Sequence, residues 1–165
     1  MAFIVVSTLL TLSYSYKKAQ KMRLLMDNLG FSIQSMSINI REGVDYNQTG
    51  CSNNKDCIQF MPIDSWLSNP PGNPVCYSLD VNSLRKCEVT GSSACPCSYD
   101  SGSALTSPEI KIKNLKFTIV PEPNLSNSLV QKKVKIIIAG EAGTVSRDLT
   151  NFFIQNTVSQ RSVGN

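Results

Sequence analysis

The chain has 165 residues, of which 41 % are hydrophobic and 17 % charged, and its formal net charge is +4. This length accommodates one domain with a single core in addition to an N-terminal helix. Histidine is absent, which excludes Ser-His-Asp and Cys-His catalysis and histidine-ligated zinc. The low content of charged residues, with polarity supplied by Ser, Asn, Thr and Gln, fits an extracytoplasmic β-rich domain better than a charged cytosolic enzyme.

Residues 1–43 are predicted to form one long helix with an apolar front half and an amphipathic back half. The front half is expected to face an apolar environment with Phe3, Ile4, Val5, Val6, Leu9, Leu10 and Leu12. In the back half, apolar residues recur at helical spacing, and we expect this stripe to pack on a sheet: Met22, Leu25, Leu29, Ile33, Met36 and Ile40. Gly43 is expected to take the left-handed conformation just past the helix end.

The apolar run is about 12 residues long, whereas a helix that crosses a bilayer needs about 20. It fits a cleaved signal segment, a buried helix end, or the lower part of a membrane helix that begins before Met1, and the helical pattern that continues beyond the run favours the third. A basic cluster follows at Lys17, Lys18, Lys21 and Arg23. By the positive-inside rule these charges place that flank in the cytoplasm, whereas the cysteines indicate the opposite side.

Six cysteines lie within one 47-residue stretch: Cys51, Cys57, Cys76, Cys87, Cys95 and Cys97. An even number behind an apolar N-terminus predicts disulfides in an oxidising compartment. A thiolate metal site and redox-active thiols are the alternatives, although the spacings lack the paired C-x-x-C that metal sites usually present.

The middle of the chain predicts a β-hairpin between two loops. Residues 44–56 and 64–74 are predicted loops that flank a short strand at 57–63. Residues 75–80 and 83–89 are predicted to pair through a turn at Val81 and Asn82, which sets Cys76 opposite Cys87 and makes these two our first disulfide. Cys51 and Cys57 then bond each other or reach Cys95 and Cys97.

The last third predicts three more strands. Residues 90–108 are a predicted loop, and a strand over 110–119 carries a one-residue slip of its alternation at Asn114, which indicates a bulge or a tight turn. Strands are predicted over 130–139 and 147–158, with a turn at 140–143 between them and a frayed end at 159–165. Together these elements predict an α+β fold, in which a long helix at 1–43 packs on an antiparallel sheet domain at 44–165.

Alternating lysines and scattered aspartates are the candidate binding groups of the sequence. The lysines fit the solvated face of a half-buried strand better than a DNA-binding patch, so we do not expect nucleic acid: Lys111, Lys113, Lys116, Lys132, Lys133 and Lys135. Calcium ligands are conceivable at Asp56, Asp64, Asp80 and Asp100, but the D-x-D-x-D-G spacing is missing. No nucleophile elbow or phosphate-binding glycine loop is present, so we expect neither an enzyme nor a cofactor.

Three segments resemble one known family. The helix segment at 18–43, the phrase Leu105-Thr-Ser-Pro-Glu-Ile110 and the phrase Thr157-Val-Ser-Gln-Arg161 are similar to type IV pilin-like proteins, especially the minor pseudopilins of type II secretion. The resemblance implies a pilin-like fold and a structural subunit, held in the cell membrane by its helix with the domain outside the cytoplasm. It also implies assembly with other pilin or pseudopilin subunits through that helix.

The family's basic leader, its Gly and the Phe-Thr-Leu-Ile-Glu motif do not occur in this sequence. Either Met1 is an internal methionine of a longer precursor, which we expect, or the protein cannot be processed as pilins are. The alternative function is that of a monomeric, membrane-tethered binding or adhesin domain outside the cytoplasm.

Overall fold

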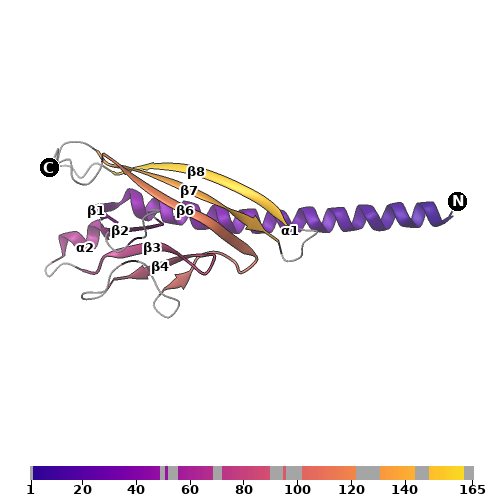
Figure 1. Ribbon diagram of the computed structural model, residues 1–165, viewed down its shortest axis with the longest axis horizontal. Helices are drawn as coiled ribbons and strands as arrows, with labels where there is room; N and C mark the ends of the chain where they lie inside the picture. The colour runs from indigo at the N-terminus through magenta and orange to yellow at the C-terminus, as the bar shows by residue number, and fades with distance from the viewer. Residues whose placement is uncertain are drawn as a thin grey trace.

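A single long helix, α1 (Ala2–Arg41), runs along the domain and projects beyond it in the computed structural model (Figure 1). At about 1.5 Å per residue it is roughly 60 Å long. Its back half is packed as the apolar spacing predicts, because Leu25, Leu29, Ile33, Met36 and Ile40 are buried while Met22 is half-buried against the same core. The helix and its packing stripe are confirmed.

The structure describes residues 2–48, 51, 56–68, 72–89, 95, 102–121, 131–143 and 149–161, with side chains in the helix from Val6 onward.

Two antiparallel sheets accompany α1, so the α+β prediction is confirmed. The first sheet has the order β1 (Gly43–Asn47), β2 (Cys57–Pro62), β3 (Val75–Asp80), β4 (Ser83–Glu88) and β5 (Ser103–Ala104). The second has the order β6 (Ile110–Val120), β7 (Lys133–Ala142) and β8 (Thr150–Ser159). A short helix, α2 (Ile63–Leu67), follows β2. The predicted loops at 44–56, 64–74 and 90–108 are thus wrong in part, since they contain most of β1, most of α2 and the whole of β5.

Helix and sheets share one core. The largest fully buried side chains of the sheets, among them Phe60, Tyr77 and Phe117, belong to the same cluster as the stripe of α1. Along β6 and β7, buried and outward residues alternate as expected of strands with one covered face. Asn39 of α1 also donates a hydrogen bond to the Tyr77 hydroxyl at 2.6 Å, which fixes the helix against β3.

The predicted hairpin has the predicted register. Leu79 pairs with Leu84, Tyr77 with Lys86 and Cys76 with Cys87. Val81 and Asn82 both have positive φ, at 43° and 64°. Two such residues in a two-residue loop match the twist of the flanking strands, which is how this turn forms without the usual Asn-Gly.

The phase slip at Asn114 is a β-bulge, as its pattern predicts, with the register shift between Ile112 and Asn114. The bulge presses on the partner strand at Gly140, where a Cβ would overlap the carbonyl oxygen of Lys111. The predicted turn at 140–143 is therefore wrong for residues 140–142, which lie inside β7. Gly140 gives the bulged strand the space that any side chain would fill.

The end of α1 is closed by close packing and a buried tyrosine. Gly43 does not have the positive φ that we expected, and a Cβ there would instead overlap the ring of Phe60. The Tyr46 hydroxyl lies 2.6 Å from the carbonyl oxygen of Ile40 and 2.7 Å from that of Gly43, so it donates its proton to the end of the helix. Such carbonyls have no partner within the helix itself, and burial raises the pKa of Tyr46 well above its ordinary value.

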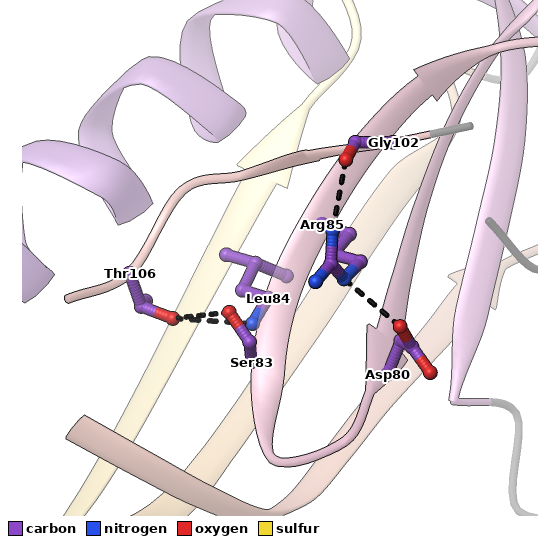
Figure 2. A network of polar contacts seen from close by, with 6 residues as sticks. All are labelled: Asp80, Ser83, Leu84, Arg85, Gly102 and Thr106. Carbon is purple, nitrogen blue, oxygen red and sulfur yellow. Dashed lines mark hydrogen bonds and ion pairs between the residues drawn. The ribbon is translucent and has the colours of Figure 1, made fainter. Parts of the chain in front are cut away.

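A polar network joins the segment around β5 to the hairpin (Figure 2). Arg85 is buried, and its Nε lies 2.9 Å from Asp80 Oδ2, an ion pair in which the N–H is not aligned for a hydrogen bond. Arg85 Nη1 donates to the Gly102 carbonyl at 2.8 Å, and the Leu84 amide donates to Thr106 Oγ1 at 3.2 Å.

The far side of the same segment bonds to the helix. Ser32 Oγ donates to the Leu105 carbonyl at 2.5 Å, and Asn28 Oδ1 accepts from the Ser107 amide at 3.2 Å. Residues 102–107 therefore bind α1 on one side and β4 on the other.

Gly140→Ala tests the close approach at the bulge. We expect it to lower the free energy of unfolding by about 1–3 kcal/mol, because the new methyl group must displace backbone. Gly30→Ala is the matched control, since nothing lies within 4 Å of a Cβ there and the helix interior favours alanine by about 0.5–1 kcal/mol. Urea unfolding measures both, and equal effects of the two substitutions contradict the packing.

Tyr46→Phe tests the helix end. At neutral pH we expect a loss of about 1–2 kcal/mol, because the buried Ile40 carbonyl loses its side-chain donor and the Gly43 carbonyl keeps only the Gln160 side chain at 3.2 Å. The raised pKa keeps the folded hydroxyl neutral where an unfolded tyrosine ionises, at about pH 10. Its contribution is therefore complete below about pH 10 and falls as the pH rises further.

The stability difference between the native protein and Tyr46→Phe should accordingly shrink above about pH 10. Urea unfolding at a series of pH values measures this difference. A constant difference across that range contradicts a buried, neutral hydroxyl.

Candidate functional site

The front half of α1 extends away from both sheets (Figure 1). Every side chain from Val6 to Lys17 is exposed. The large ones are between 52 % and 69 % exposed: Val6, Leu9, Leu10, Leu12, Tyr14 and Tyr16. The backbone of Phe3, Ile4 and Val5 belongs to α1, while their side chains lie outside the described part of the structure. We call residues 2–16 the projecting segment.

The projecting segment contains no charged residue. At 100° per residue, its described apolar and aromatic side chains spread over more than half of the helix circumference. The remaining face carries small hydroxyl residues, and Thr11 Oγ1 donates at 2.9 Å to the carbonyl oxygen of Ser7 on the same helix. A hydroxyl that bonds its own backbone is removed from water at a lower cost, so this face too can be buried.

Within the described residues, α1 and α2 both lack an apolar stretch long enough to cross a membrane.

The basic cluster marks the point where α1 enters the domain. Lys21 Nζ lies 3.4 Å from Glu109, just ahead of β6, whereas Arg23 pairs with Asp27 within the helix at 3.9 Å. The Arg23 pair is exposed and contributes little to stability. Lys21 therefore links the helix to the start of the second sheet, just after the projecting segment ends.

The cysteines are bonded, as predicted, but not in our first pairing. Cys51 bonds Cys57 and Cys76 bonds Cys95, with Cα–Cα separations of 5.3 and 5.8 Å. The expected Cys76–Cys87 bond is wrong even though these residues are opposed in the hairpin, because Cys95 lies close enough to bond Cys76. Cys87 is also disulfide-bonded, and Cys97 lies outside the described residues.

The bonded cysteines form a small second core, which comprises Cys57, Cys76, Cys87, Val89 and Cys95 with Cys51 against it. The sulfur atoms of Cys51, Cys57 and Cys95 lie within 4.8 Å of one another. All three are oxidised, and a metal requires thiolates, so the alternative of a thiolate metal site does not hold for them.

The other residues considered as ligands lie apart. Asp80 pairs with Arg85, Asp64 is exposed in α2, and Asp100 lies outside the described residues. In the part of the chain that the structure describes, no three carboxylates gather as a calcium site would require. Of the lysines, Lys111, Lys113 and Lys116 are exposed on the outer face of β6, as predicted for a solvated strand.

A groove that sequence reasoning missed lies between the C-terminal part of α1 and β8. It has a volume of about 440 Å³ and is lined by Gln34, Ser37, Ile38 and Arg41 of the helix, by Gln131, and by residues 156–161. A neighbouring hollow continues it past Glu42 and shares Ile38, Arg41 and Arg161. No sequence pattern indicates it, because its two walls are more than 110 residues apart.

Hydrogen bonds fix the two walls of the groove. Asn156 Nδ2 donates to Ser37 Oγ at 2.8 Å, and the Arg161 amide donates to the Arg41 carbonyl at 2.8 Å. Residue 161 is thus held against the helix end, although a frayed C-terminus was predicted over 159–165.

Comparison of the chain with protein-family models, curated proteins and solved structures finds no match.

Mass spectrometry tests the disulfide pairing. We expect the non-reduced protein to be six hydrogens lighter than the reduced one, since all six cysteines would be bonded. Peptide mapping should join Cys51 to Cys57 and Cys76 to Cys95, which leaves Cys97 as the expected partner of Cys87. Alkylatable thiols, or a peptide that joins Cys76 to Cys87, contradict the pairing.

Proposed function

We propose that the protein is a non-enzymatic structural subunit, a minor pilin or pseudopilin of a type IV pilus or type II secretion-like filament. The observation that carries the proposal is the projecting segment, an uncharged helix whose exposed apolar side chains spread over more than half of its circumference. A helix that is apolar around most of its surface is normally buried on most sides. Packing among the helices of other subunits buries it in this way.

The energy available from such packing is large. Burying one leucine side chain stabilises by about 1.5–3 kcal/mol, so Leu9, Leu10 and Leu12 alone supply several kcal/mol of association. One face of the back half of α1 is already covered by the sheets, so the same helix holds the domain at one end and offers a contact surface at the other. Before assembly we expect lipid to cover this surface, with the disulfide-bonded domain outside the cytoplasm.

A monomeric, membrane-tethered binding or adhesin domain is the second candidate. The groove between α1 and β8 favours it, because a built hollow on the folded domain is not needed for packing among helices. The two candidates differ in what the projecting segment contacts: other subunits in the first and lipid alone in the second.

The double substitution Leu9→Lys with Leu12→Lys tests assembly. We expect the native protein to associate on detergent removal. The double variant should associate at least about 100-fold more weakly, since it lacks two leucines that assembly would bury. Leu67→Lys is the control, because Leu67 is at least as exposed, at 72 %, but lies in α2, and it should associate like the native protein. Analytical ultracentrifugation and negative-stain microscopy measure the association.

A native protein that stays monomeric at every concentration, in solution and on vesicles, overturns the filament proposal. If it nonetheless floats with vesicles through its helix, the tethered domain takes its place.

A further inference from the structure

β8 is the outermost strand of the second sheet (Figure 1), and among the described residues no strand pairs with its outer edge. An unpaired edge presents a row of N–H and C=O groups to which another chain can add. Natural edges are usually protected by charges or proline, but residues 150–159 contain neither.

The direction of the backbone groups on β8 follows from its hydrogen bonds. The Gln160 amide donates to the Lys132 carbonyl at 2.8 Å, on the side of β7. Because successive residues of a strand direct these groups to alternate edges, the odd-numbered residues direct theirs outward. The Arg161 amide is consistent with this direction, since it donates to the Arg41 carbonyl outside the sheet. The Thr157 amide donates to Asn156 Oδ1 at 2.8 Å. The outward amides that remain on β8 belong to Asn151, Phe153, Gln155 and Ser159, and the Thr157 carbonyl also points outward.

The groove beside this edge has a distinct chemistry. Ile38 supplies an apolar patch, and amide and hydroxyl side chains from both walls supply donors and acceptors. Arg41 and Arg161 are exposed at its end, and neither forms an ion pair with a described residue, while Glu42 is the acidic residue at the margin. Arginine binds carboxylates through paired hydrogen bonds, so the groove favours an acidic group.

We propose that β8 and the last turns of α1 bind an extended acidic peptide segment of a partner protein. The segment adds to the outer edge of β8 as a fourth strand, and its carboxylates lie against Arg41 and Arg161. Main-chain hydrogen bonds to the strand provide affinity, and the groove selects the side chains.

A second copy of the chain fits the edge less well. Residues 150–160 include no aspartate or glutamate, so the β8 of another copy brings no carboxylate to the two arginines. Two copies also carry the same net charge of +4. An acidic partner satisfies both the edge and the charges.

The probe is a fluorescein-labelled peptide, Thr-Glu-Thr-Val-Thr-Glu-Thr, capped at both ends, and fluorescence anisotropy measures its binding at low salt. The full chain carries the Leu9→Lys and Leu12→Lys substitutions, so that association through the helix does not compete and the two proposals succeed or fail separately. We expect saturable binding that Arg41→Gln and Arg161→Gln each weaken by about fivefold. Arg23→Gln, which removes the same charge elsewhere on α1, should change it by less than about twofold.

Two further probes examine the contact without altering the protein. A peptide with Gln in place of Glu should bind about as weakly to the native groove as the acidic peptide binds to the arginine variants. A peptide N-methylated along one edge cannot pair with β8, and its affinity should be at least about tenfold lower. Bound acidic peptide should also protect the amides of Phe153, Gln155 and Ser159 from hydrogen exchange.

Absence of binding at millimolar peptide overturns the proposal. Equal binding by the arginine variants, by the Gln peptide or by the N-methylated peptide also overturns it. Sedimentation as a dimer with the β8 amides already protected would instead assign the edge to a second copy.

Discussion

Burial of one helical stripe is the interaction on which the rest of this structure depends. A sheet with one apolar face must cover it with another layer, and here a single helix serves two sheets. Leu29, Met36 and Ile40 are fully buried in a cluster that also contains residues of both sheets. Without the stripe, the apolar faces of both sheets would lose their shared cover, and the segment at 102–107 would lose its bonds to Asn28 and Ser32.

The same packing fixes the direction of the projecting segment. Residues 2–41 form one continuous helix, and no proline occurs before Pro62 to break it. Holding the back half against two sheets therefore orients the front half, without any contact of its own to the domain. Lys21 with Glu109 reinforces the point of entry. The free half of the helix is thus positioned by the buried half.

Periodic features could be predicted from the sequence because they depend on neighbours along the chain. The stripe on α1, the hairpin register and the bulge at Asn114 are of this kind. Features that need a distant partner could not be predicted. Cys76 bonds Cys95 because the folded chain brings the two together, and a glycine stands inside β7 at position 140 because the Lys111 carbonyl approaches it there. Arg41 and Arg161 likewise meet only in the folded chain, so the groove has no signal in the sequence.

The two proposed surfaces lie toward opposite ends of α1 and use different physics. The projecting segment offers apolar area, which attracts without direction and tolerates several arrangements of neighbours. The groove offers oriented backbone groups and two arginines, which select a strand with a defined charge. Leu12 and Arg41 are about 40 Å apart along the helix, so a partner on one surface does not displace a partner on the other. A subunit embedded by its projecting segment would therefore keep the edge of β8 open.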